Sequence, residues 1–213
     1  MHILKSISVL SLATLINIAD VYAAETSIEI TPLIGYRFGG DFDVENSVSN
    51  SNSTIKLVEG NSYGLIVAWP YTIKQQGELL VSHYKTEFNQ ASLTNNVNLF
   101  NDDGVGVTYA HLGGNVPVSD GAIPFWVTGG LGLTHFSPDD SELNSETRFS
   151  MNIGLNTQLE ITEQLSFRLE GRLYGTFFNS ESEVFCDNNA CKIYISSNVW
   201  LQSEVNAGLT FKF

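Results

Sequence analysis

Two side chains that could cooperate in catalysis, His135 and Ser137, stand two positions apart in the chain. If this segment is a β-strand, both lie on one face, because successive side chains point to opposite sides. A serine beside an imidazole base, with a carboxylate such as Glu142 or Glu146 nearby, is an arrangement that activates the hydroxyl as a nucleophile. A histidine that merely lies at the end of a strand gives the same pattern, and we favour that interpretation.

A second group of charged side chains follows the alternation of several expected strands. Arg168, Glu170 and Arg172 are spaced by two, so all three point to the same face of one strand. The charges expected on this shared face are Glu29, Arg37, Glu78, Glu160, Arg168, Glu170, Arg172 and Glu204, with Lys212 near the C-terminus. Such a set either lines a polar pore or forms ion pairs, since guanidinium groups without carboxylates would leave buried charge unpaired.

Acidic residues are concentrated between the expected strands. Asp139, Asp140 and Glu142 could offer oxygen ligands to a divalent cation. The twelve-residue calcium-loop pattern is missing from the sequence, however, as are phosphate loops, dinucleotide fingerprints and metal-binding histidine pairs. We therefore expect no metal and no cofactor, and interpret the acidic segments as solvated loop surface whose partner is unknown.

The two cysteines, Cys186 and Cys191, flank an Asp-Asn-Asn segment, which favours a turn. Two thiols without a nearby histidine make a poor zinc site, so we expect a disulfide that closes this small loop. In the entropic account of disulfides, closing so short a loop stabilises the fold by about 2 kcal/mol.

The composition excludes several classes of protein. The 213 residues fit one domain. The formal net charge of −13 argues against nucleic-acid binding, which requires a basic surface. With 43% hydrophobic and 11% aromatic residues the chain is too apolar to be disordered. Beyond the N-terminus no run of about 18 apolar residues marks a transmembrane helix.

The first residues have the form of an export signal. Lys5 precedes a mostly apolar stretch, and Val21-Tyr22-Ala23 resembles a small-residue cleavage site. We expect a signal peptide at residues 1–23 and a mature domain at residues 24–213, exported to a compartment that permits disulfides.

From Ile28 onward apolar residues recur with a period of two, which predicts strands and not helices. The clearest window is residues 149–161, where Phe149, Met151 and Ile153 begin an alternation with polar residues. The expected strands are residues 28–38, 62–69, 77–87, 104–112, 124–136, 149–161, 165–177 and 201–213. Most have about the length that crosses a bilayer at a tilt.

The connections between these strands alternate in length. Long ones are expected at residues 40–61, 88–103, 137–148 and 178–198, and short ones at residues 70–76, 113–123 and 162–164. This alternation is typical of membrane barrels, which have long external loops and short periplasmic turns. Aromatic residues near the strand ends predict two girdles: Tyr36, Phe38, Tyr63, Phe149 and Phe177 at the loop side, and Trp69, Phe125, Phe167 and Phe211 at the turn side.

The sequence therefore predicts an all-β, eight-stranded antiparallel up-and-down transmembrane β-barrel with its charged face inward. The alternative is a soluble barrel with its apolar face inward, but the charged face carries too few lysines for a water-exposed surface. An eight-stranded barrel is just wide enough for its own side chains, so we expect ion pairs to close the lumen.

The last strand, residues 205–213, and the strand at residues 124–136 resemble those of the small eight-stranded outer-membrane barrels of Gram-negative bacteria, the OmpA/OmpX-like group. The resemblance implies a chain in the cell outer membrane, in contact with outer-membrane lipid and lipopolysaccharide. Because an even number of strands returns the chain to its starting side, where the short turns lie, we expect both termini in the periplasm. It also implies an assembly signal, read by the barrel insertion machinery, at Leu209, Phe211 and Phe213. The group includes adhesins, lipid-modifying enzymes and barrels without an assigned role.

His135 and Ser137 also resemble the His-x-Ser element of outer-membrane lipid A deacylases, although Pro138 follows the serine where those enzymes carry Asn. We expect a structural or surface-interaction barrel, not an enzyme and not a channel. Lipid A acyl hydrolysis by His135 and Ser137, or conduction through a narrow pore, are the alternatives.

Overall fold

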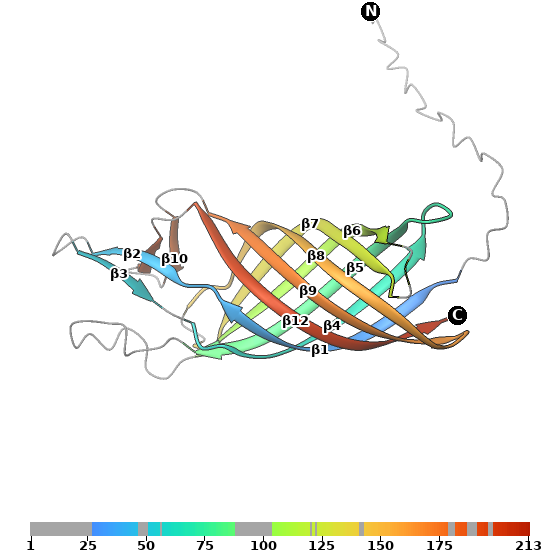
Figure 1. Cartoon of the computed structure of the whole chain (residues 1–213). Helices are drawn as coiled ribbons and strands as arrows, with labels where there is room; N and C mark the ends of the chain where they lie inside the picture. The colour runs from blue at the N-terminus through green and yellow to red at the C-terminus, as the bar shows by residue number, and fades with distance from the viewer. Residues whose placement is uncertain are drawn as a thin grey trace, which may run out of the picture.

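The strand-forming alternation of the sequence produces eight long strands in the structure, a computed structural model. They are β1 (Glu29–Gly39), β4 (Gly60–Pro70), β5 (Gln76–Glu87), β6 (Gly104–Ser119), β7 (Phe125–Pro138), β8 (Glu146–Thr162), β9 (Leu165–Phe177) and β12 (Val199–Lys212). They pair antiparallel in the order β1-β12-β9-β8-β7-β6-β5-β4, and β4 closes the barrel on β1 (Figure 1). The prediction of an all-β, eight-stranded antiparallel up-and-down barrel is confirmed.

The structure describes residues 27–46, 51–55, 57–87, 104–119, 121, 123–140, 143–178, 182–186, 191–195 and 198–213. The expected signal peptide at residues 1–23 and the whole second long connection, residues 88–103, lie outside these residues. Among the described residues no helix is long and apolar enough to span a membrane.

Strand β6 is longer than the sequence predicted. It continues through Gly113, Gly114 and Asn115 to Ser119, where a turn was expected because glycine and asparagine favour turns. In the structure Gly113 lies opposite Gly130, and Gly114 lies opposite Gly129. A Cβ atom on Gly113 would overlap the backbone oxygen of Gly129, so these glycines allow two strands to approach closely and do not form a turn.

Two of the long connections also contain short strands that the sequence did not reveal. β2 (Phe42–Asn46) and β3 (Ser51–Ile55) come from the first, and β10 (Ser182–Cys186) and β11 (Cys191–Ile195) from the last. They form one sheet in the order β10-β11-β2-β3, joined where Ile195 pairs with Val44. Figure 1 shows this sheet beyond the barrel, at the end opposite the C-terminus. Strands this short depend on partners distant in sequence, which periodicity cannot identify.

Cys186 and Cys191 are register partners on β10 and β11. Directly opposed residues of an antiparallel pair point to the same face, which is the backbone arrangement that a disulfide needs. The side chains of these short strands lie outside the described part of the structure, so the disulfide stays a prediction.

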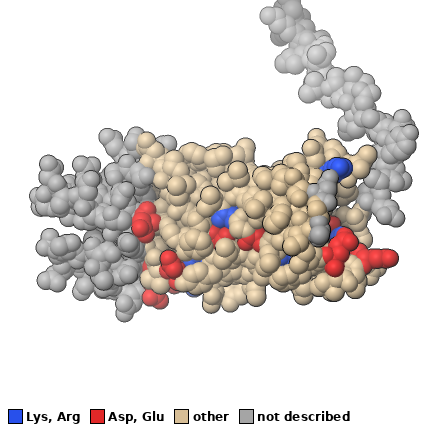
Figure 2. Space-filling view, in the orientation of Figure 1, with Lys and Arg blue, Asp and Glu red and all other residues tan. Residues whose placement is uncertain are grey.

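The barrel is apolar outside and polar inside. Large hydrophobic side chains are exposed on every long strand, for example Ile34, Leu112, Ile153 and Leu201, each about 60% exposed. Figure 2 shows a mostly uncharged wall, with charged residues near the two ends and a small group visible in the middle. The inward positions hold the buried charges and amides. A soluble barrel has the opposite polarity, whereas a transmembrane barrel has this one.

Candidate functional site in the barrel lumen

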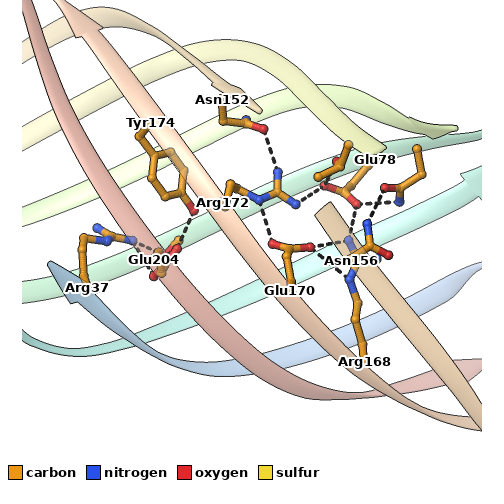
Figure 3. A network of polar contacts seen from close by, with 12 residues as sticks. Arg37, Glu78, Asn152, Asn156, Arg168, Glu170, Arg172, Tyr174 and Glu204 are labelled. Atoms are coloured by element: carbon orange, nitrogen blue, oxygen red, sulfur yellow. Dashed lines mark hydrogen bonds and ion pairs between the residues drawn. The ribbon is translucent and has the colours of Figure 1, made fainter. Parts of the chain in front are cut away.

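Four charged side chains meet in the middle of the lumen (Figure 3). Glu78 accepts hydrogen bonds from Arg168, with Nη2 2.9 Å from Oε2, and from Arg172, with Nη2 2.8 Å from Oε1. Glu170 also bridges both arginines, with its Oε1 2.7 Å from Nε of Arg172 and its Oε2 bound to Arg168. All four side chains are at most 3% exposed. We call Glu78, Arg168, Glu170 and Arg172 the central cluster.

Uncharged side chains from three further strands complete this cluster. Nδ2 of Asn115 on β6 donates to Oε2 of Glu78 over 2.8 Å, and Arg172 Nη1 donates to Oδ1 of Asn152 on β8 over 2.8 Å. Asn156 Nδ2 in turn donates to Oδ1 of Asn115 over 3.0 Å. Together with Thr128 on β7, which bonds Glu78, these contacts extend the network over five strands. Buried charges therefore have the hydrogen-bond partners that compensate for lost hydration.

A second ion pair joins β1 to β12. Arg37 Nη2 lies 2.8 Å from Oε1 of Glu204, and both side chains are completely buried. Ser82 on β5 and the hydroxyl of Tyr174 on β9 also bind the Glu204 carboxylate. The carboxylate is thus held by one guanidinium and two hydroxyls, which fixes it in place.

Three tyrosine rings surround the same guanidinium. The Cζ atom of Arg37 lies 4.6 Å, 4.9 Å and 5.2 Å from the ring centroids of Tyr84, Tyr109 and Tyr174. These distances are those of cation–π contacts, which favour a desolvated arginine. Gln202 links two of the hydroxyls, accepting from Tyr109 over 2.9 Å and donating to Tyr84 over 2.6 Å. The sequence did not single out these tyrosines, although each lies on the inward face, Tyr174 two positions after Arg172.

The lumen becomes apolar toward the loop end. Phe136 lies between Phe178 and Trp200, with ring centroids 5.9 Å and 5.2 Å away. Val105 and Val107 on β6 are buried at the same end. Below this layer His111 lies against Tyr109 and Tyr174 and binds Ser150. Arginines, tyrosines and this aromatic layer therefore fill successive levels of the lumen.

The arrangement joins six of the eight charges that the sequence assigned to the lumen. Glu29 is also inward and buried, but it lies near the start of β1 and belongs to neither ion cluster. Glu160 lies outside the network, with a side chain 73% exposed and 3.2 Å from Lys212 Nζ. The β8–β9 register shifts between Glu160 and Thr162, beside the turn, where the barrel end is open to water.

The two ion clusters of the lumen are balanced in charge. Three arginines face three glutamates, and each charged group contacts at least one of opposite sign. Among the described residues no three His, Cys, Asp or Glu side chains are arranged to hold a metal ion. The contacts instead stabilise a filled cross-section.

His135 and Ser137 lie outside the lumen. Both are exposed on the outward face of β7, so they share one face, as their spacing predicted. The Nδ1 atom of His135 lies 2.9 Å from the hydroxyl of Thr147 on β8. Of the two candidate carboxylates, Glu146 pairs with Arg148 over 2.6 Å, and Glu142 lies outside the described residues. The structure therefore brings the histidine and serine to one surface, and among the described residues no carboxylate is hydrogen-bonded to His135.

The expected girdle and assembly residues are on the outward face. Tyr36, Phe38, Tyr63, Phe149 and Phe177 are exposed toward the loop end, and Phe125 and Phe211 toward the turn end, while Trp69 and Phe167 are half-buried. Leu209 and Phe211 lie outward on β12, and Phe213 is the exposed last residue.

Neither a protein-family model nor a curated protein matches the sequence. Solved structures do match. Neisserial surface protein A (NspA) aligns with a TM-score of 0.52 at 11% identity, covering 88% of this chain and 97% of that one. The outer membrane protein AlkL aligns with a TM-score of 0.53 at 10% identity, covering 88% and 90%. These likenesses show the fold: the chain has the architecture of the small eight-stranded outer-membrane β-barrels, as its last strand suggested.

Proposed function

We propose that this chain is an integral outer-membrane β-barrel with a closed, charge-paired lumen and with both termini in the periplasm. Its role is structural or one of surface interaction through its long acidic external loops, and not solute conduction. The observation that carries this proposal is the combination of an apolar outward wall with buried, mutually paired arginines and glutamates in the lumen.

The outward wall supports membrane insertion. Transfer of apolar surface from water to lipid is favourable, and a closed barrel leaves no strand edge unpaired in the hydrocarbon. At one end of the barrel β8 and β9 are joined through only Glu163 and Gln164, while the small sheet of β2, β3, β10 and β11 lies at the other end. Short turns at the periplasmic side and long loops outside are the normal orientation of such barrels, which supports a periplasmic location of both termini.

The packing of the lumen supports a closed barrel. Arg37, Arg168, Tyr84, Tyr109, Tyr174 and Trp200 are each less than 2% exposed even though they point into the barrel. Opening a water path would require Arg37 and Arg168 to separate from the Glu204 and Glu78 carboxylates, which lie 2.8 Å and 2.9 Å away. Removing one ion from such a buried pair leaves the other uncompensated, at a cost of several kcal/mol.

The external end is acidic. Asp41, Glu59, Glu87, Asp139 and Asp140 lie at or next to the loop-side strand ends. A surface of this sign attracts cationic partners. The role in surface interaction therefore favours a basic partner or one bridged by divalent cations.

Two measurements test the proposal. Membrane fractionation should place the mature protein in the outer membrane, and recovery in the soluble periplasm would overturn membrane insertion. Purified protein in planar bilayers should give no stable conductance. Steady, reproducible ion channels from the unmodified protein would overturn the closed lumen.

A second candidate function is hydrolysis of lipid A acyl chains. It is favoured by the position of His135 and Ser137 on the outward face near the loop end of β7, where they would meet outer-leaflet lipid. If Ser137 is the nucleophile and His135 its base, overexpression should reduce the number of acyl chains on lipid A, and Ser137→Ala should abolish this reduction. Unchanged lipid A mass spectra with the intact protein would rule this activity out.

A further inference from the structure

A row of polar side chains interrupts the apolar outward wall on one side of the barrel. His83 on β5 is the register partner of Thr108 on β6, Thr108 that of His135 on β7, and His135 that of Thr147 on β8. Directly opposed residues point to the same face, so all four side chains project outward from adjacent strands. We call these four residues the polar row.

The polar row contains the same hydrogen-bonded pair twice. Nδ1 of His83 lies 2.8 Å from Oγ1 of Thr108, and Nδ1 of His135 lies 2.9 Å from Oγ1 of Thr147. In each pair the hydroxyl fixes the orientation of the ring through one nitrogen. No side chain among the described residues bonds the Nε2 atom of either ring, so both rings retain a free polar edge. Two rings held in this way form an ordered set of hydrogen-bonding groups.

The wall changes polarity sharply at the polar row. The next outward row toward the turns consists of Val81, Ala110, Leu133 and Phe149, which are register partners of one another. On the loop side follow Ser137 and Lys85, whose Nζ lies 3.2 Å from Asp139 Oδ1 and whose side chain is 69% exposed. A ligand that covers both rows must be apolar along one part and polar along the other, as a membrane lipid is.

The rest of the circumference is different. On β1, β4 and β9 the outward positions toward the loop end carry the aromatic residues Tyr36, Phe38, Tyr63 and Phe177. Such aromatic side chains are the usual interfacial anchors of a membrane barrel and favour no particular headgroup. The row of paired histidine and threonine side chains is therefore found on the side formed by β5 to β8.

The width of the polar row indicates the kind of headgroup. Four adjacent strands spaced by about 4.8 Å give a row about 14 Å long, which is wide for a single glycerophosphate and suits linked sugars. Imidazole and hydroxyl groups donate and accept hydrogen bonds, as sugar hydroxyls require, and the ammonium of Lys85 can bind a phosphate. We propose that the polar row, together with Lys85, binds the phosphorylated sugar headgroup of an outer-leaflet glycolipid. Since the row meets such a lipid only in an outer membrane, this inference rests on the proposed function.

The test compares lipids retained by the purified, folded protein. Native mass spectrometry with added lipid A or phosphatidylglycerol should show preferential retention of lipid A by the wild type. His83→Leu/His135→Leu should lower that retention about tenfold, the loss expected when two hydrogen bonds are removed. Ser203→Val is the matched control, because Ser203 is an outward polar residue on β12, away from the polar row, and it should retain lipid A as the wild type does.

Two further variants sharpen the assignment. His83→Leu alone disturbs the polar row without altering His135 or Ser137, so its loss of lipid A cannot come from the catalytic candidate. Lys85→Met should weaken retention of lipid A but leave that of dephosphorylated lipid A unchanged. Equal retention of lipid A by the wild type and the double histidine variant, or equal retention of both lipids by the wild type, would overturn the inference.

Separate assays test the proposed function. Heat-dependent gel mobility and protease protection in phosphatidylcholine vesicles report whether each variant folds and inserts. A wild type that fails to insert contradicts the proposed membrane barrel. Variants that insert normally but retain less lipid A support the polar row as the lipid-binding site, independently of membrane insertion.

Discussion

Glu78 on β5 and Arg172 on β9 meet across the full width of the barrel, with Oε1 2.8 Å from Nη2. The strand order places three strands between β5 and β9 on either side, so these two residues project from opposite walls. Because Glu170 binds the same guanidinium from its own strand, one arginine connects both walls. The contact therefore bridges the lumen from one wall to the other.

Removing Glu78 should therefore destabilise the barrel strongly. In Glu78→Ala the two arginines of the central cluster keep only Glu170 as a carboxylate partner, which leaves excess positive charge buried. We expect the free energy of unfolding to fall by about 3–5 kcal/mol, measured by urea titration of the refolded protein in lipid vesicles. Glu160→Ala is the control: its exposed pair with Lys212 should contribute at most about 1 kcal/mol. Equal losses in the two variants would contradict the central cluster.

Arg37 and Glu204 should show strong coupling in a double-mutant cycle. Arg37→Met leaves a buried carboxylate bound only by hydroxyls, and Glu204→Met leaves a buried guanidinium with the tyrosine rings. Each single change should lower the free energy of unfolding substantially, whereas the double change removes both charges and should cost less than the sum by about 1–3 kcal/mol. The same urea titrations measure this difference. Additive losses would show that the two charges do not depend on each other.

Gly132 and Gly171 should respond oppositely to the same substitution. A Cβ on Gly132 would overlap the backbone oxygen of Ala110 on β6, whereas a Cβ on Gly171 would meet nothing within 4 Å. Gly132→Ala should therefore cost about 1–3 kcal/mol of unfolding free energy through strain. Gly171→Ala should be neutral or stabilise by up to about 1 kcal/mol, because it restricts the unfolded chain. The shift in the midpoint of thermal unfolding measures both effects. A lower midpoint for Gly132→Ala alone indicates close strand contact at Gly132, whereas a lower midpoint for both variants would mean that glycine positions in this barrel do not tolerate side chains in general.

Cys186 and Cys191 should be oxidised in the exported protein. Their opposed register on β10 and β11 predicts that neither thiol reacts with an alkylating reagent until a reductant is added, as mass spectrometry would show. Cys186→Ser/Cys191→Ser should leave barrel folding intact, since both residues lie in the small sheet outside the barrel. Alkylation of both thiols without reductant would disprove the disulfide.

The sequence alone was sufficient to predict the eight long strands and the faces to which their side chains point. Alternation is a local property of extended backbone, so residues 149–161 could be divided into inward and outward positions without any partner. For the same reason Arg168, Glu170 and Arg172 were assigned to the lumen, and His135 and Ser137 to one common face. The lengths of the connections then distinguished the two ends of the barrel.

The tertiary structure decided which of these residues meet. Barrel closure and the stagger between strands set the height of each side chain, and neither is encoded in the alternation of a single strand. Arg172 thus binds Glu78 from the opposite wall, Glu204 on the neighbouring strand binds Arg37, and Glu160 at the barrel end binds Lys212 in water. Gly113 continues β6 because two other glycines lie opposite it and its neighbour. The small outer sheet likewise exists only because closure brings segments about 150 residues apart in sequence to the same end of the barrel.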